Sequence, residues 1–399
     1  MEATPSKWSE QLCKMGTGPV PIQPYFDEDF FEREREKIFR KVWLNVCRVE
    51  EIPNPGDYIV KDLAVLRTSI IVVRGKDGKV RAFHNMCSHR GNKVAIEPSG
   101  SSKGFTCFFH GWTYDTDGRL RGVADEKSFT GLCKNELGLT PLSADIWEGF
   151  VFVNANRQPE QTLAEYLGEF GAQMAGFPLS EMSECYSWAA EVDVNWKVAK
   201  DAFAESYHVK ALHRNSVAGA LTSAQNPFSH ALAFHVYGPH QCISMGGNRA
   251  YRPKPTSILA AQQSSRMKRY EATNEAARLP PGINPTHSED WVFEITTIFP
   301  NMNLHFFLNS FTTYNFWPLS VDRTVWEVKQ YYRPAENASD LFAQEVMKNL
   351  FRDTVLEDLS TLERTQSVLN SGAKSQFFLN DEEVLIRRFN EIVDEYLEA

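Results

Sequence analysis

The fold of this 399-residue chain is decided by two stretches, NMCSHRGNKV at residues 85–94 and FTCFFHGWTYD at residues 105–115. Each stretch contains one cysteine and one histidine, as Cys87-x-His89 and Cys107-x-x-His110, with seventeen residues between the pairs. A Cys2His2 zinc finger instead places its two cysteines in one pair and its two histidines in the other. The alternation favours a two-iron, two-sulfur cluster with two thiolates on one iron and two imidazoles on the other.

The residues around these stretches are typical of an all-β domain. Between about 46 and 155, short runs rich in β-branched and aromatic residues alternate with turns such as NPGD and DTDG. Two hairpin loops of such a domain can bring the four ligands together. Gly91 and Gly111 follow the histidines and would let the backbone turn tightly near the sulfur atoms. A structural zinc site is the rival interpretation, and acid-labile sulfide in a red-brown protein would distinguish the two.

At these residues the chain resembles the Rieske non-haem iron oxygenases, the family that includes the aromatic-ring dioxygenases. C-S-H-R-G followed by C-x-x-H-G-W-T-Y-D is similar to the Rieske signature of that family. The resemblance implies a [2Fe-2S] cluster on Cys87, His89, Cys107 and His110. It also implies a second, mononuclear iron site in the same chain.

The segment NWKVAKDAFAESYHVKALH, residues 195–213, is the candidate for that second site. We expect a helix over 201–213. A mononuclear iron(II) oxygenase needs two histidines and one carboxylate on one face. His208 and His213 would lie about 140° apart on a straight helix, so they could share a metal only if the helix ends or distorts between them. The spacing alone is also typical of surface or core histidines. The pattern N-W-K…E-x-x-H-x4-H resembles the catalytic-iron segment of the family, which implies that both histidines are ligands.

The third ligand is expected far downstream, in LFRDTVLEDLSTLERTQ at residues 350–366. The pattern E-D-x4-E-x-x-Q resembles the stretch of the family that carries the carboxylate ligand, and that position is Asp358. Glu357 and Asp353 are the local rivals, because helix surfaces carry such acids routinely.

Two acidic residues beside the histidines are candidate catalytic residues. Glu205 lies one helical turn before His208, where it could hold the imidazole ring, although a solvent-facing glutamate would look the same. In the family, an acid at this position links the iron site to a Rieske histidine of the neighbouring subunit, and it is usually aspartate. Asp201 stands where the family often has asparagine, and its role is left open.

Composition excludes several classes of function. The net charge of -9 argues against nucleic acid or an anionic membrane as the main partner. The chain has no apolar run long enough to cross a bilayer, and its first residues lack the core of a signal peptide, so we expect a cytoplasmic protein. The seven scattered cysteines do not suggest a disulfide framework.

Several common motifs are absent. The sequence has no G-x-G-x-x-G or P-loop pattern, so we expect electrons to come from a ferredoxin or an NAD(P)H reductase rather than from a nucleotide bound here. His230, His235 and His240 recur every five residues, and pocket or core positions are favoured for them over a third metal site.

The sequence therefore predicts an α+β protein in three parts. They are an N-terminal helical segment (1–45) that packs on the catalytic domain, an all-β Rieske domain (46–155) and a catalytic domain (156–399) built on an antiparallel sheet with helices, of helix-grip type. Further expectations are helices at 26–45, 161–174, 340–369 and 381–398, strands at 291–319 and 324–334, and a long connection at 248–285.

The resemblance implies a terminal oxygenase, or alpha, component that uses O2 to hydroxylate a small apolar substrate, with aromatic molecules favoured. A Rieske monooxygenase or demethylase of O-methyl or N-methyl (quaternary amine) substrates is the alternative. A pure Rieske electron carrier and a non-enzymatic metal-binding protein are the rivals from other classes. Family members form head-to-tail trimers, so we expect a homotrimer, with or without a β subunit.

Overall fold

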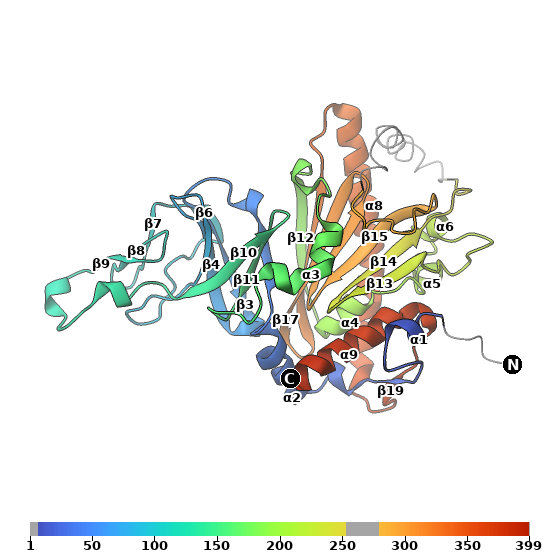
Figure 1. The fold of residues 1–399 in the computed structure, drawn as a ribbon, viewed down its shortest axis with the longest axis horizontal. Helices are drawn as coiled ribbons and strands as arrows, with labels where there is room; N and C mark the ends of the chain where they lie inside the picture. The colour runs from blue at the N-terminus through green and yellow to red at the C-terminus, as the bar shows by residue number, and fades with distance from the viewer. Residues whose placement is uncertain (1–6, 253–278, 399) are drawn as a thin grey trace. The chain divides into compact units, whose positions relative to one another are not determined.

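The computed structural model describes residues 7–252 and 279–398, which form two compact units (Figure 1). One unit contains residues 1–34 and 167–399, and the other contains residues 35–166. Most of the connection predicted at 248–285 lies outside the described residues. Nowhere in the described parts of the chain does a helix have both the length and the apolar content that a bilayer span requires.

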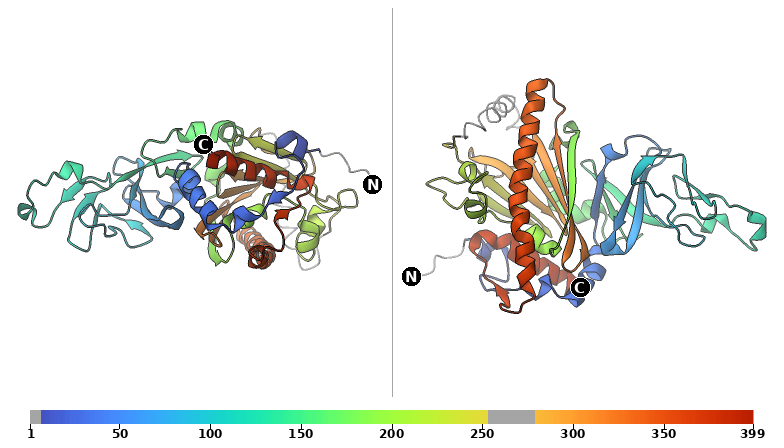
Figure 2. Two further views of the ribbon diagram at one scale, coloured as in Figure 1. Left: turned by 90° about the horizontal axis from the view of Figure 1, so that it is seen from below. Right: turned by 180° about the vertical axis from the view of Figure 1, so that it is seen from behind.

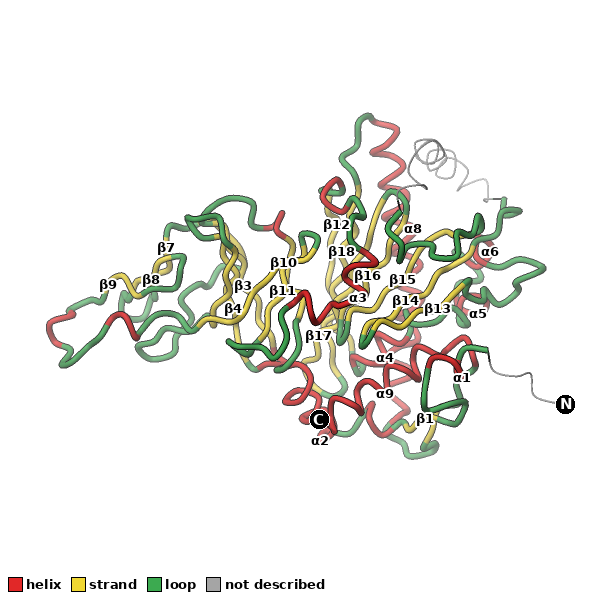
Figure 3. The backbone as a smooth tube through the Cα atoms, in the orientation of Figure 1, coloured by secondary structure: helices red, strands yellow, loops and turns green. Residues whose placement is uncertain are grey.

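The unit of residues 35–166 is built from two antiparallel sheets (Figure 3). The larger sheet has the strand order β2-β11-β10-β5-β4-β3-β6, and the smaller has the order β7-β8-β9. The strands are β2 (Leu44–Arg48), β3 (Asp57–Leu63), β4 (Thr68–Arg74), β5 (Val80–His84), β6 (Ser99–Ser101), β7 (Gly104–Thr106), β8 (Thr113–Asp115), β9 (Leu120–Gly122), β10 (Pro141–Trp147) and β11 (Phe150–Asn154).

The core of this unit lies beneath the two motif loops. Ile71 and Val73 of β4 and Phe83 of β5 pack in one buried cluster with Cys87 and Cys107. Strands β5 and β6 flank the first motif loop, and β7 and β8 flank the second. The predicted all-β architecture around the motif is confirmed.

The other unit is built on an antiparallel seven-stranded sheet of order β12-β18-β17-β16-β15-β14-β13. Its strands are β12 (Glu184–Val192), β13 (Ala233–Tyr237), β14 (His240–Gly246), β15 (Trp291–Ile298), β16 (Met302–Phe307), β17 (Ser310–Ser320) and β18 (Arg323–Tyr332), and a small sheet pairs β1 (Val20–Pro21) with β19 (Gln376–Phe377). The described helices are α1 (Ser9–Leu12), α2 (Glu28–Glu34), α3 (Leu163–Met174), α4 (Trp196–Asp201), α5 (Val209–Leu212), α6 (Ala218–Leu221), α8 (Ala338–Leu369) and α9 (Val384–Glu398).

Helices cover both faces of this sheet. On one face, Phe351 of α8 stacks on Tyr314 of β17 with ring centroids 6.1 Å apart, and Figure 2 shows α8 lying along the sheet. On the other face, Phe170 of α3 contacts His240 of β14 at 5.2 Å. We call the first of these the α8 face. The predicted antiparallel sheet with helices is confirmed.

The first predicted helix is too long. Helix α2 ends at Glu34, residues Arg35–Phe39 form a π-helical turn, and β2 begins at Leu44, inside the range 26–45 expected to be helical. The apolar residues at the end of that range lead into β2, which is buried throughout. A short apolar run in a sequence does not distinguish a buried strand from a helix.

Candidate metal centres

His208 and His213 lie at the two ends of a single helical turn. The helix expected over 201–213 is wrong, because α4 ends at Asp201 and α5 spans only Val209–Leu212. His208 directly precedes α5 and His213 directly follows it. The chain thus has the break that the five-residue spacing required, and the two rings lie with centroids 5.1 Å apart.

Asp358, from the middle of α8, completes a group of three side chains that could hold a metal ion. Its Oδ1 lies 3.6 Å from Nε2 of His208 and 3.1 Å from Nε2 of His213. One ligand atom from each residue falls within 4.8 Å of the others. Asp358 is 3% exposed, and its Oδ1 receives no hydrogen bond from the protein. A buried carboxylate oxygen without a donor, beside two imidazole nitrogens, fits the two-histidine, one-carboxylate set that binds iron(II).

Each of the two histidines also contacts a glutamate carboxylate through its other ring nitrogen, Nδ1. Oε1 of Glu205 contacts Nδ1 of His208, and its Oε2 accepts a hydrogen bond from the His208 amide at 3.2 Å. Nδ1 of His213 lies 2.8 Å from Oε2 of Glu357, which also accepts from Ser216 Oγ at 2.5 Å. Such partners fix the ring orientation and leave Nε2 of each histidine for the metal.

These carboxylates also set the charge balance of the site. Burial lowers the pKa of His208, but the hydrogen bond and the charge of Glu205 raise it above its ordinary value. Burial likewise lowers the pKa of His213, and Asp358 and Glu357 raise it on balance. The sequence pattern alone makes Glu357 a rival ligand to Asp358. The structure places it behind His213, while Asp353, the other rival, is exposed and pairs with Arg352 at 2.7 Å.

Asp201 lies outside the three-residue group. Its Oδ2 accepts a hydrogen bond from the Tyr25 hydroxyl at 2.8 Å, and its Oδ1 lies 3.1 Å from Lys200 Nζ. Burial raises the pKa of Glu383, and the charges of Glu205 and Asp201 raise it further. Asp201 therefore ties α4 to the N-terminal segment through Tyr25, and burial raises its own pKa.

The three regularly spaced histidines do not gather around a metal in the described residues. His240 is buried and accepts a hydrogen bond from the amide of Phe299 at 3.1 Å. Burial lowers the pKa of His235. His230 is exposed, with Nδ1 3.9 Å from Glu382.

The other four predicted ligands meet at the tips of two matching loops. The amide of Gly91 donates to the carbonyl of Cys87, and that of Gly111 to the carbonyl of Cys107, both at 2.9 Å. Both glycines have positive φ, 78° and 69°, a conformation that side chains with a Cβ rarely adopt. The same turn thus occurs in each loop, as the sequence predicted.

The four side chains in these loops fit the ligand set of a Rieske cluster. The two cysteines are buried, the two histidines are partly exposed, and Nδ1 of His89 lies 3.1 Å from Nδ1 of His110. Tyr114 Oη lies 3.2 Å from Cys87 Sγ. Burial raises the pKa of the Cys107 thiol, but hydrogen bonds from nearby backbone and side-chain donors bring it below its ordinary value. Polar donors around the sulfurs favour the thiolate that iron requires.

Two family models match the chain. Residues 179–399 match the model described as "Ring hydroxylating alpha subunit (catalytic domain)", and residues 42–134 match the "Rieske [2Fe-2S] domain". The chain belongs to the ring-hydroxylating alpha-subunit family. The predicted cofactors, a Rieske cluster and a mononuclear non-haem iron, are thereby confirmed, while the assignment of individual ligands stays a prediction.

Relatives of this alpha-subunit chain include both dioxygenases and monooxygenases. It is 36% identical over 188 residues to the alpha subunit of 2-aminobenzenesulfonate 2,3-dioxygenase from Alcaligenes sp, which covers 46% of this chain and 47% of the relative. It is 32% identical over 192 residues to the carnitine monooxygenase oxygenase subunit of Acinetobacter pittii (strain PHEA-2), covering 47% and 51%. The chain spans about half the length of the curated relatives it matches.

Solved structures extend the likeness over nearly the whole chain. A quaternary ammonium Rieske monooxygenase has a TM-score of 0.77 at 21% identity, with 99% of this chain and 100% of that chain covered. Naphthalene 1,2-dioxygenase from Rhodococcus sp. has a TM-score of 0.74 at 23% identity, covering 95% and 94%. At these identities the likeness establishes the fold.

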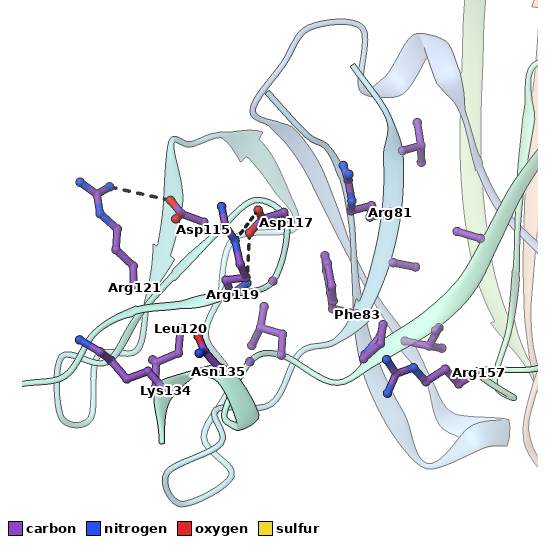
Figure 4. A pocket seen from close by; sticks show the side chains of 18 residues that line it. Arg81, Phe83, Asp115, Asp117, Arg119, Leu120, Arg121, Lys134, Asn135 and Arg157 are labelled. Carbon is purple, nitrogen blue, oxygen red and sulfur yellow. Dashed lines mark hydrogen bonds and ion pairs between the residues drawn. The ribbon is translucent and has the colours of Figure 1, made fainter. Parts of the chain in front are cut away.

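A cleft of about 840 Å³ in the unit of residues 35–166 is separate from either ligand set (Figure 4). Its floor includes Phe83 and its rim carries several cations. Arg119 pairs with Asp117 at 2.8 Å, and Arg121 lies 3.9 Å from Asp115. Carboxylates thus pair with two of these cations, and none of the predicted metal ligands lines the cleft.

Proposed function

We propose that this chain is the terminal oxygenase component of a Rieske non-haem iron oxygenase system that oxidises a small, mainly apolar substrate with O2. The observation that carries the proposal is the group of His208, His213 and Asp358, because a pure electron carrier needs no second ligand set. When bound, the cluster supplies electrons one at a time and the mononuclear iron supplies O2 activation. A ferredoxin or an NAD(P)H reductase is the proposed electron donor.

The residues of the chain have distinct proposed roles. Cys87, His89, Cys107 and His110 hold the cluster. In the catalytic unit, Glu205 and Glu357 orient the two iron-binding imidazoles through Nδ1. Asp201 acts as a positioning residue that ties α4 to the N-terminal segment through Tyr25.

The domain boundaries proposed are 46–155 for the Rieske domain and 156–399 for the catalytic domain. Family-model matches at 42–134 and 179–399 support them. Residues 1–34 group with the catalytic unit, which supports packing of that part of the N-terminal segment on the catalytic domain, whereas residues 35–45 group with the unit of residues 35–166.

An aromatic substrate is the class we favour. Phe203, just before the iron-binding segment, stacks on Tyr314 at 4.7 Å and contacts Trp326 at 5.2 Å. Such ring faces also suit a quaternary ammonium group. N-demethylation or C–N cleavage is therefore the second candidate reaction. The similarity to proteins named for carnitine oxidation supports it.

Metal content and oxygen uptake test the proposal together. The purified full chain should be red-brown and contain about three iron atoms and about two acid-labile sulfides. With a surrogate reductase, oxygen uptake should depend on substrate, and product mass should show one added oxygen, two, or a lost methyl group. About two irons with no substrate-dependent uptake would indicate an electron carrier, and a colourless zinc protein would indicate a structural metal site.

We also propose a head-to-tail homotrimer, in which the cluster loops of one copy cover the Glu205 segment of the next. The cluster loops expose apolar side chains, with Phe108 80% exposed and Phe109 beside it. On the catalytic unit, Tyr207, two residues after Glu205, and Phe228 are both exposed, and the centroids of their rings lie 6.2 Å apart. Two different apolar patches on one chain suit a heterologous contact, which closes into a ring.

Phe108→Glu should disrupt this assembly. A carboxylate at the centre of an apolar contact would be desolvated without a partner, so we expect the trimer to dissociate at micromolar concentration and turnover to fall at least about tenfold. Sedimentation and oxygen uptake measure the two effects. Phe342→Glu is the matched control, because Phe342 is also exposed (48%) but lies sixteen residues before Asp358 on α8, about 24 Å away along the helix axis. An unchanged sedimentation profile in the Phe108 variant would contradict the proposed contact.

A further inference from the structure

Three uncharged polar side chains form a row across the α8 face of the sheet. His305 of β16 pairs directly with Thr312 of β17, and Thr312 pairs directly with Gln330 of β18. Directly paired residues point to the same side of a sheet, and neighbouring strands lie about 4.8 Å apart. The row therefore spans roughly 10 Å, at right angles to the strands.

Two members of this row have hydrogen-bonding atoms that no protein group uses. His305 is 5% exposed and Gln330 is 2% exposed. Nε2 of His305 and Oε1 of Gln330 are buried without a partner, although Nε2 of Gln330 donates to the Tyr332 hydroxyl at 3.1 Å. An unsatisfied buried polar group costs about 1–3 kcal/mol, and such groups are normally paired. Two on one row indicate a partner from outside the protein.

The row adjoins the iron-binding group through aromatic rings. The His305 ring lies 4.7 Å from the Tyr314 ring and 6.2 Å from Phe203, five residues before His208. Burial raises the pKa of Tyr314, and the charge of Asp358 raises it further, which places Tyr314 near the proposed iron ligand. A molecule that contacts His305 and these rings would therefore lie beside the proposed iron site.

The partner should be uncharged and should donate a hydrogen bond. Strand alternation puts even-numbered residues of β17 and β18 and odd-numbered residues of β14, β15 and β16 on this face, and none of these carries a charge. On the edge strand β12 the face has one charged residue, Glu184, which is exposed. Burial lowers the pKa of His305 to about 3, so its imidazole is neutral. Oε1 of Gln330 can only accept a hydrogen bond, so its partner must carry N–H or O–H.

We propose that His305 and Gln330 bind a polar substituent of the substrate, and that the preferred substrates are neutral aromatic molecules bearing an amino, amide or hydroxyl group. This inference rests on the proposed function only for the fate of the bound molecule. A site built for an N–H or O–H group discriminates strongly against analogues without it, because its own polar atoms are then left unpaired. Plain hydrocarbons and quaternary amines should both bind less well.

Matched probes that differ by a single NH2-to-CH3 exchange test the proposal. The iron-loaded full chain is titrated calorimetrically with 2-aminonaphthalene against 2-methylnaphthalene, 2-aminobiphenyl against 2-methylbiphenyl, and benzamide against acetophenone. We expect at least one amino or amide probe to bind tenfold or more tightly than its methyl partner. Gln330→Met, which keeps side-chain length, and His305→Leu should each bring that ratio close to one.

The control is Asn315→Leu. Asn315 also has a buried amide nitrogen without a partner, but it projects from the opposite face of β17. This variant should keep the wild-type ratio. The proposal is overturned if no donor-bearing probe exceeds its methyl partner, if trimethyl(phenyl)ammonium binds more tightly than every such probe, or if Gln330→Met leaves the ratio unchanged.

Oxygen uptake with the tightest probe and a surrogate reductase separates the two proposals. Selective binding without uptake would refute the oxygenase function and leave the recognition by His305 and Gln330 standing. Uptake without selectivity would support the oxygenase function and refute the recognition by His305 and Gln330.

Discussion

Replacing Asp358 by alanine is expected to remove the mononuclear iron and to lower substrate-dependent oxygen uptake by more than about 100-fold. Asp358 is the only carboxylate of the described metal-binding group, and its Oδ1 lies within 3.6 Å of both imidazole Nε2 atoms. Two histidines alone bind iron(II) weakly, because no anionic ligand then offsets the charge of the ion. The Rieske cluster should persist, so iron per chain should fall by about one while sulfide stays constant.

Asp353→Ala is the matched control for this variant. Asp353 is on the same helix, five residues earlier, but it is exposed and pairs with Arg352. Metal analysis, the visible spectrum of the cluster and oxygen uptake should all match the wild type. Full iron content and activity in the Asp358 variant would show that another residue supplies the third ligand.

The Rieske domain and its two candidate ligand loops could be predicted from sequence because each loop is local. Cys87 and His89 are joined by one residue, and a glycine with positive φ follows in each loop, so the motif itself determines the geometry. The surrounding sheet followed from β-branched runs separated by turns. The match of residues 42–134 to the Rieske domain model agrees with the domain predicted from these local patterns.

The iron-binding segment was harder to predict because tertiary structure overrides local propensity there. The sequence between Asp201 and His213 has helical periodicity, yet the helix is interrupted between α4 and α5. That interruption brings the two imidazoles to one carboxylate on a distant helix. Local rules are expected to fail at functional sites, where the geometry of the site is favoured over regular structure.

Long-range register explains the features that the sequence did not reveal. Glu357 and Asp358 are adjacent on α8, and only the packing of α8 against His213, 144 residues away, shows which of them faces the imidazole Nδ1. The polar row of His305 and Gln330 likewise depends on strand pairing, since a shift of one residue would turn either side chain to the opposite face. Neither relation has a signal in a single sequence.

Glu205→Gln is expected to keep both metal centres and to reduce turnover by at least about 100-fold. In the wild type, Glu205 contacts Nδ1 of His208 with one oxygen and accepts from the His208 amide with the other. Glutamine has the same length, and its carbonyl oxygen can still accept from Nδ1, so the imidazole should stay in place. The negative charge is lost, and with it the hydrogen-bonded anion that we propose links His208 to the cluster of the neighbouring copy.

Rapid mixing of the fully reduced protein with O2 and substrate measures this effect directly. Oxidation of the cluster, followed by its visible absorbance, should be slowed at least as much as turnover. Glu357→Gln is the matched control, because Glu357 holds His213 as Glu205 holds His208. This variant should likewise keep its iron, because the amide oxygen can still accept from Nδ1 of His213, but it should leave cluster oxidation fast. Equal slowing in both variants would mean that Glu205 only orients the histidine, and wild-type rates in Glu205→Gln would remove it from the electron path.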